Sequence, residues 1–236
     1  CERTIQIISV SDNGEWYTTR YRLAERQISQ EDTATKQAFE AYYEADNQTD
    51  VLYICSATEE GVRYEIPDGR NPLFSAESDW IAYQIKPEAE EDEEEPETYI
   101  ELKHLPSGFT VKYESGADYS FWEEQNYFLT TDENSLLIYD LANRSEHYIG
   151  DIGEYLVEKN AAHIAYTIAS ADRRGNGIYL YDPEAMTTRA LHTSRLTYSG
   201  LSWNHDKTAL AAYTYQLVDE EIDYPNTNVL VVRDIS

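Results

Sequence analysis

The chain alternates between short apolar runs and short polar turns, and one such phrase recurs five times. Its copies are VSDNGEWYTT (10–19), FSAESDWIAY (74–83), FWEEQNYFLT (121–130), VEKNAAHIAY (157–166) and WNHDKTALAA (203–212). Each copy opens on an apolar residue, passes through turn-forming Asp, Asn, Glu, Ser, Gly or Lys, and then resumes an apolar stretch. The phrase therefore predicts the end of one strand, a tight turn and the start of a second strand.

A second phrase follows the first in most copies and predicts two further strands. It reads DVLYICSATEEGVRYEIP (50–67), TYIELKHLPSGFTVKY (98–113), SLLIYDLANRSEHYIG (135–150) and GIYLYDPEAMTTRALH (177–192), with a shortened last copy at NVLVVRDIS (228–236). Apolar residues alternate with polar ones in these copies, for example at Ile178 and Leu180. Together the two phrases predict units of four antiparallel strands.

The spacing of these units predicts the fold class. The seventh positions of the first phrase are Trp16, Trp80, Tyr127, His163 and Ala209, so successive units are 64, 47, 36 and 46 residues apart. Four-stranded units at this spacing are typical of β-propeller blades, including WD40-like repeats. We expect an all-β propeller of about five blades over residues 1–236, and an incomplete ring if the full set is larger. An irregular β-sandwich is the alternative.

Two insertions account for the uneven spacing. Residues 24–48 place Phe39, Tyr42 and Tyr43 at helical spacing, which predicts one short surface helix. Residues 86–97, KPEAEEDEEEPE, form an acidic run that we expect to be a solvated loop. This run lacks the alternating oxygen ligands and the turn glycine of a calcium loop, so we expect no metal there.

Charge narrows the range of partners. The chain carries 45 acidic and 18 basic residues, for a net charge of −27. Phosphates would be repelled, so nucleic acid is not an expected partner. Abundant carboxylates with few lysines are typical of a halophilic surface, although one acidic loop on an ordinary acidic protein is the alternative. No run of 18 apolar residues is present, so we expect no membrane span.

The two cysteines, Cys1 and Cys55, do not make a disulfide framework. Cys1 is either a lipidated first residue or the start of an excised segment, and a strand is expected to begin within three residues of it. Cys55 is expected to be a buried strand residue. The compartment stays open: few cysteines fit the cytoplasm, whereas a lipidated Cys1 fits the cell envelope.

No catalytic, metal-binding or cofactor-binding residue is assigned from the sequence. Gly200-Leu201-Ser202-Trp203-Asn204 begins like the nucleophile elbow G-x-S-x-G but lacks its last glycine, and Ser202 falls inside a predicted strand. His163 occupies the repeat's Trp position and is expected to pack in a strand. The remaining histidines, expected near turns, are His104, His147, His192 and His205. The tryptophans, Trp16, Trp80, Trp122 and Trp203, are expected to pack in the core.

The order of the phrases resembles the N-terminal β-propeller region of bacterial prolyl oligopeptidase-family serine peptidases. The likeness runs from SVSDNGEW through YEIPDGRNPLFSAESDWIAYQIKP, the acidic run and NGIYLYDP to YSGLSWNHDKTALAAYTY. It covers most of the chain except residues 24–48. TolB-like periplasmic propellers share the S-x-D-G-x-W style of turn, so the individual phrases are less specific than their order.

The resemblance implies a non-catalytic role. In that family the propeller, usually of seven or eight blades, restricts access of peptides to an α/β-hydrolase domain that carries the catalytic triad. We therefore expect peptide substrates and a hydrolase domain as partners, no activity in this chain, and a periplasmic or extracytoplasmic location. Some family members bind the substrate amine with a glutamate pair, but Glu123 and Glu124 fall in a predicted turn and are not assigned that role. A free-standing TolB-like envelope propeller that binds a protein partner is the alternative.

Overall fold

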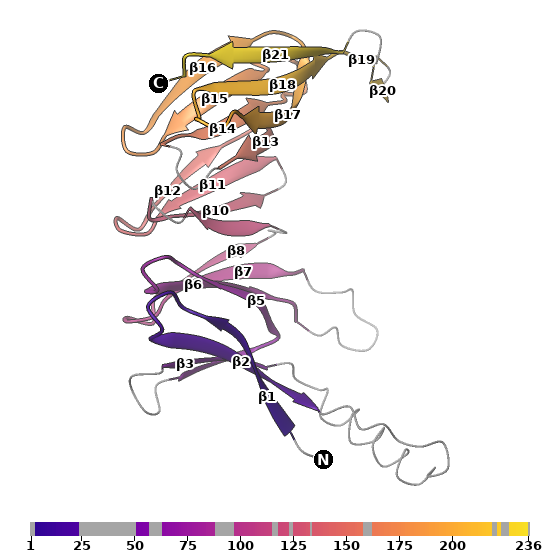
Figure 1. The fold of residues 1–236 in the computed structure, drawn as a ribbon. Helices are drawn as coiled ribbons and strands as arrows, with labels where there is room; N and C mark the ends of the chain where they lie inside the picture. Colours follow the sequence, from indigo (N-terminus) through magenta and orange to yellow (C-terminus); the bar gives the residue numbers. More distant parts are fainter. Residues whose placement is uncertain are drawn as a thin grey trace, which may run out of the picture. The chain divides into compact units, whose positions relative to one another are not determined.

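The computed structural model contains only β-strands as regular elements among the residues it describes (Figure 1). These residues are 3–23, 51–56, 63–87, 97–114, 118–122, 125–132, 134–157, 162–218, 221–222 and 227–235. The helix expected within 24–48 and most of the acidic loop at 86–97 lie outside the described residues. The part of the chain that the structure describes contains no helix long and apolar enough to cross a membrane.

Consecutive strands form four four-stranded antiparallel sheets. The first contains β1 (Arg3–Val10), β2 (Trp16–Leu23), β3 (Val51–Ser56) and β4 (Arg63–Pro67). The second contains β5 (Gly69–Phe74), β6 (Trp80–Ile85), β7 (Tyr99–His104) and β8 (Thr110–Glu114). The third contains β9 (Tyr119–Trp122), β10 (Tyr127–Asp132), β11 (Ser135–Asp140) and β12 (Ser145–Ile149). The fourth contains β13 (Ile152–Leu156), β14 (Ile164–Ile168), β15 (Gly177–Asp182) and β16 (Thr187–Thr193).

The fifth sheet has three described strands in the order β17-β18-β21. These are β17 (Thr197–Trp203), β18 (Ala209–Tyr215) and β21 (Asn228–Arg233), and a two-stranded hairpin of β19 (Leu217–Val218) and β20 (Glu221–Ile222) interrupts them. Every described sheet is built from one continuous stretch of the chain, so the β-sandwich alternative is wrong. The chain has the β-propeller fold, and each sheet is one blade.

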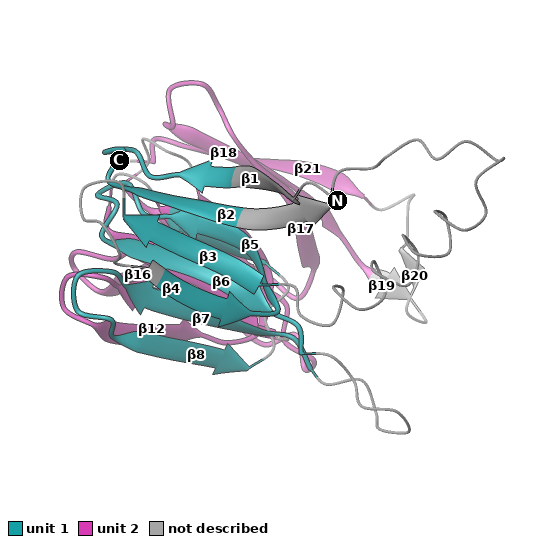
Figure 2. Cartoon of the chain, turned by 90° about the horizontal axis from the view of Figure 1, so that it is seen from below, with its two compact units in different colours: residues 1–121 teal, residues 122–236 magenta. Residues whose placement is uncertain are grey.

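The chain divides into two compact units, residues 1–121 and 122–236, and each is described by itself (Figure 2). In the first unit β1 contacts β5, and in the second β13 contacts β17. In these two pairs of consecutive sheets the first strands therefore lie side by side, as the inner strands of neighbouring propeller blades do.

A conserved side-chain role explains why the turn phrase recurs. The Ser11 Oγ accepts the Trp16 backbone N–H at 3.0 Å, and the Ser75 Oγ accepts the Trp80 N–H at 3.1 Å. In the fifth sheet Asn204 replaces the serine, and its Oδ1 accepts the Ala209 N–H at 2.8 Å. In these three copies a short polar side chain thus closes the turn and satisfies the first N–H of the second strand.

Strand register confirms that the sheets are equivalent. The seventh residue of four phrases faces one residue of the third strand, giving the pairs Trp16–Ser56, Trp80–His104, Tyr127–Asp140 and Ala209–Arg233. In the fourth sheet the pairing begins one residue later, at Ile164–Tyr181. Because strand side chains alternate between the two faces, a shared register puts equivalent residues on equivalent faces of every sheet.

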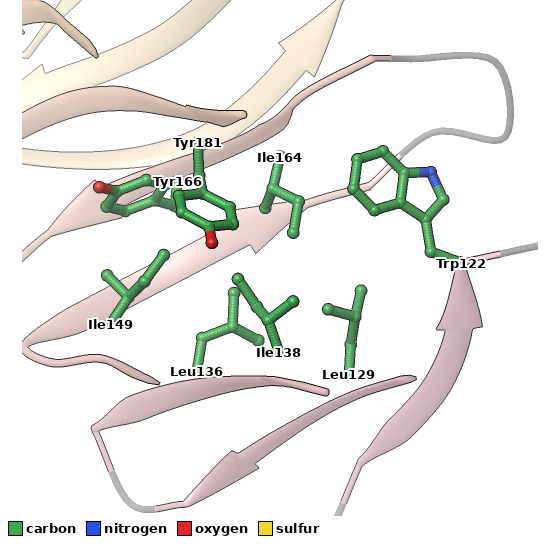
Figure 3. Close-up of a cluster of buried hydrophobic side chains, with 8 residues drawn as sticks. All are labelled: Trp122, Leu129, Leu136, Ile138, Ile149, Ile164, Tyr166 and Tyr181. Carbon is green, nitrogen blue, oxygen red and sulfur yellow. The ribbon is translucent and has the colours of Figure 1, made fainter. Parts of the chain in front are cut away.

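The core lies between consecutive sheets. We call the face of a sheet that packs on the next sheet in the chain its rear face, and the opposite face its front face. In the second unit, Leu129, Leu136 and Ile138 form the rear face of the third sheet and contact Ile164, Tyr166 and Tyr181 on the front face of the fourth sheet (Figure 3). All six are at most 3% exposed, so this contact excludes water and supplies most of the hydrophobic stabilisation that a single sheet lacks.

Candidate functional site

Ser202 does not have the surroundings of a nucleophile. It lies in β17, as the repeat predicts, immediately after a break in register between Ser199 and Ser202. Its side chain is exposed, and among the described residues no histidine or carboxylate hydrogen-bonds its hydroxyl. A serine nucleophile needs an adjacent base to accept its proton.

One Ser-His-Asp arrangement does occur in the described residues, and no motif in the sequence indicates it. His104 lies between Ser107 and Asp79: its Nδ1 is 2.7 Å from the Ser107 Oγ, and its Nε2 is 3.9 Å from the Asp79 Oδ2. The Ser107 Oγ also accepts the Phe109 N–H at 3.3 Å, while the His104 ring contacts the Trp80 ring at 4.8 Å.

The geometry of this arrangement favours a structural role. The Gly108 N–H bonds to the His104 carbonyl, so both it and the Phe109 N–H are already used within the turn. No pair of free N–H groups is left there to stabilise an oxyanion. The Leu105 N–H also bonds to the Asp79 carbonyl at 2.8 Å. These contacts tie the β7–β8 turn to the turn before β6.

The other described histidines also have structural partners. The His163 Nε2 is 3.8 Å from the Asp182 Oδ2, and the His192 Nδ1 shares a hydrogen bond of 2.7 Å with the Tyr198 hydroxyl. His205 lies in the turn before β18, as expected. His147 lies in β12, close after the turn that precedes this strand, and stacks on Tyr181 with ring centroids 4.7 Å apart. The prediction that His163 lies in a strand is wrong, because β14 begins one residue later, at Ile164.

The described residues give no indication of a metal site or of a reactive thiol. They contain no group of three or more His, Cys, Asp or Glu side chains that could hold a metal ion. The prediction that Cys55 is buried is wrong, because its side chain is half-buried on β3 while Leu52 and Ile54 take the rear face. Cys1, Glu123 and Glu124 lie outside the described residues.

The first strand of several sheets has a break in its pairing register, and two of these breaks are joined by the carboxylate of Glu154. Register breaks occur in four of the described first strands, namely β1, β5, β13 and β17. At the break in β13, the Glu154 N–H donates to the Thr167 Oγ1 at 3.0 Å. The Glu154 Oε1 accepts the Leu201 N–H at 2.7 Å, within the break in β17. Glu154 therefore links two blades by satisfying an N–H that the ladder has lost.

Aromatic side chains mostly serve packing. Trp80 and Trp122 are 2% exposed, whereas Trp16 and Trp203 are half-buried. Tyr83 is buried and donates its hydroxyl to the Glu101 Oε2 at 2.7 Å. Burial, followed by the Glu101 carboxylate, raises the pKa of Tyr83 far above the ordinary tyrosine value. Such a phenol stays protonated at any physiological pH and offers no acid–base chemistry.

Comparison with known proteins identifies no family for this chain. No family model matches the sequence, and no curated protein matches it. The β-propeller domain of the trilobed protease from Pyrococcus furiosus is 11% identical, with a TM-score of 0.43 over 98% of this chain and 70% of that chain. A prolyl endopeptidase is 12% identical, with a TM-score of 0.43 over 99% and 37% of the two chains. TolB from Acinetobacter baumannii is 14% identical, with a TM-score of 0.39 over 98% and 65%.

Proposed function

We propose that this chain is the non-catalytic propeller region of a prolyl oligopeptidase-like serine peptidase, in which it filters peptide substrates and docks against an α/β-hydrolase domain. The order of the repeated phrases, which become register-equivalent sheets, carries this proposal. The absence of a catalytic arrangement from the described residues is consistent with it, because Ser202 has no base and Ser107 is used within a turn.

Inter-sheet packing supports the filtering role. Three apolar clusters fill the spaces between consecutive sheets within the two units, so each unit is built to be rigid. A rigid set of blades discriminates by size: a short or extended peptide passes along the inner strands, whereas a folded protein does not. The half-buried Glu154 carboxylate on such a strand adds a polar group to that surface.

A fluorophosphonate probe tests the proposal directly. The purified chain is incubated with the probe and with chromogenic peptide and ester substrates, and labelling is read by mass spectrometry. We expect no labelling and no turnover, with Ser202→Ala and Ser107→Ala behaving like the parent chain. Stoichiometric labelling that either substitution abolishes would contradict the proposal.

The TolB-like alternative rests on the turn phrase, whose S-x-D-G-x-W style TolB-like propellers share. The hydrogen bonds accepted by Ser11 and Ser75 would close such a turn in any propeller. The gene sequence beyond the codon for Ser236 separates the two functions. A following domain with G-x-S-x-G supports the peptidase region, and a stop codon supports the free-standing propeller. Under the alternative, capture of an envelope protein by the intact chain is the expected activity.

A further inference from the structure

Two Asn-Gly steps occur in the sequence, Asn13-Gly14 and Asn176-Gly177. At such a step the glycine backbone nitrogen can attack the side-chain carbonyl carbon of the asparagine, because glycine has no Cβ to hinder the approach. The structure places the two steps in opposite surroundings. It therefore distinguishes the step that can react in the folded chain from the step that cannot.

Asn13 lies in the exposed turn between β1 and β2, where two donors converge on its side-chain oxygen. The Asn13 Oδ1 accepts the Ser11 hydroxyl and the Glu15 N–H, each at 2.9 Å. This oxygen becomes negatively charged when a nitrogen adds to the Asn13 Cγ. Donors that are already in place stabilise that charge, as the oxyanion hole of an acyl-transfer enzyme does.

Glu15 supplies a carboxylate beside the group that must leave. The Asn13 Nδ2 donates to the Glu15 Oε2 at 3.2 Å. A carboxylate at this distance can pass the proton of the attacking nitrogen to the departing amide nitrogen, which then leaves as ammonia. The turn thus holds the electrophilic carbon, its oxyanion donors and a proton-transfer group together.

The attacking nitrogen belongs to Gly14, which is free to move. Nothing lies within 4 Å of the Gly14 Cβ position, and its φ is +72°. The Gly14 N–H donates to the Ser11 carbonyl at 2.9 Å, and this exposed bond can open without moving the core. Asn13 itself is anchored, because its N–H donates to the Ser78 Oγ at 3.1 Å. The carbon that is attacked is therefore held while the attacking nitrogen moves.

Asn176 has similar hydrogen bonds but lacks this freedom. It is 2% exposed, and its Oδ1 accepts the Ser170 N–H at 2.9 Å and the Ser170 hydroxyl at 3.1 Å. Gly177 pairs with Ile168 on one side and with Thr193 on the other. Its nitrogen cannot turn toward the Asn176 Cγ without disturbing the strand pairing, so folding protects this step.

We propose that Asn13 is a self-modifying site that converts to isoaspartate in the folded chain. The bond between the Gly14 nitrogen and the Asn13 Cγ forms, the Cγ–Nδ2 bond breaks, and ammonia leaves a cyclic imide. Water then opens the imide at either of its carbonyls, which gives isoaspartate or aspartate. The net reaction consumes water and releases ammonia, and it does not depend on the peptidase role.

A comparison of the folded and the unfolded chain tests this site, with Asn176 as the control within the same molecule. The purified chain is incubated in mildly alkaline buffer with and without guanidinium chloride. Peptide mapping with electron-transfer fragmentation then separates isoaspartate from aspartate. We expect Asn13 to convert at least as fast in the folded chain as in the unfolded chain, while folding slows Asn176 by about tenfold or more. Equal protection of both steps, or no conversion of Asn13 in the folded chain, overturns the proposal.

Substitutions test the part that the turn plays. Asn13→Gln should abolish the conversion, because the longer side chain closes a larger ring far more slowly. Glu15→Gln should slow the conversion several-fold in the folded chain and leave the rate in guanidinium chloride unchanged. Glu184→Gln removes an exposed carboxylate from the turn between β15 and β16 and should change neither rate. If Glu15→Gln reacts as fast as the parent in the folded chain, the turn does not promote its own modification and the proposal is wrong.

Discussion

At the residue scale, the repeat preserves positions and roles while side-chain types vary. The seventh position of the phrase is Trp80 in the second sheet, where its ring contacts the tilted ring of His104, and His163 in the fourth, where it pairs with Asp182. The first contact joins the second strand to the third, and the second joins the residue just before β14 to the end of β15. Cross-strand pairs of different chemistry can therefore stabilise the same place in a sheet.

Gly177 is a position where the backbone excludes any side chain. It begins β15 beside a register break, and a Cβ built on it would lie 2.4 Å from the His192 carbonyl oxygen. Gly177→Ala should lower the free energy of unfolding by about 1–3 kcal/mol, because backbone atoms must move. Urea unfolding followed by circular dichroism measures this. Gly150→Ala is the matched control, since nothing lies within 4 Å of its Cβ position; equal losses in the two variants would contradict the account.

At the element scale, the sheets are held by their neighbours. A rear face and the following front face make one shared apolar cluster, as Leu180 and Ile178 do with Leu210 and Ala212. A single sheet cannot cover both of its faces, so its stability depends on the next sheet as much as on its own ladder.

Equivalent positions in consecutive sheets should respond differently to truncation. Leu180→Ala removes a side chain that is 1% exposed and should cost about 2–5 kcal/mol. Val231→Ala truncates the register-equivalent residue of the fifth sheet, which is 50% exposed, and should cost less than about 0.5 kcal/mol. Chemical unfolding of both variants checks the contrast. Similar losses of stability in the two variants would contradict this contrast, because they would mean that the rear faces of the fourth and fifth sheets are in the same environment.

Much of the element order could be predicted because hairpin turns and alternating strands are encoded locally. The repeated phrase predicted β6, β10 and β18, each beginning at the expected seventh position, and β14, which begins one residue after it. His163 was expected within a strand but lies one residue before β14 begins. The contact of His104 with Ser107 and Asp79 was missed because it joins two turns that come together only through strand register.

Buried residues just beyond the third strands were also missed. Leu105 and Leu141 follow β7 and β11 directly, and Ile235 follows β21; they are 1%, 6% and 7% exposed. Each donates its N–H to the carbonyl that precedes a seventh position, at Asp79, Asn126 and Thr208. A lone apolar residue at the edge of a polar turn carries no periodic signal, so only the folded sheet distinguishes it.

At the scale of the whole molecule, charge and buried tyrosines set the response to solution conditions. The net charge is −27, and the chain has 21 tyrosines. Carboxylates repel one another in the compact state, while buried phenols resist ionisation. Salt and alkaline pH should therefore act on stability in opposite directions.

Alkaline pH should destabilise the fold. Burial raises the pKa of Tyr83, Tyr119 and Tyr166 above the ordinary value of 10.0. Above about pH 10 the unfolded chain loses tyrosine protons that the folded chain retains, so the free energy of unfolding falls as pH rises. Urea unfolding between pH 8 and pH 11 measures the slope. Tyr83→Phe should make this slope shallower; an unchanged slope would show that Tyr83 does not contribute.

Salt should stabilise the chain if its surface is halophilic. At about 1 M salt the Debye length falls to roughly 3 Å, which screens repulsion among the carboxylates. We expect the melting temperature to rise with potassium chloride concentration in differential scanning calorimetry. A melting temperature that falls steadily with added salt would contradict this prediction.

Nuclear Overhauser contacts between backbone protons test most directly whether the chain is a series of equivalent, sequential sheets. The account predicts cross-strand contacts at equivalent register, between Leu129 and Ile138, Ala165 and Leu180, and Ala211 and Val231. It predicts no ladder contacts between strands of different sheets. Ladders that join strands from distant segments into two facing sheets would contradict it.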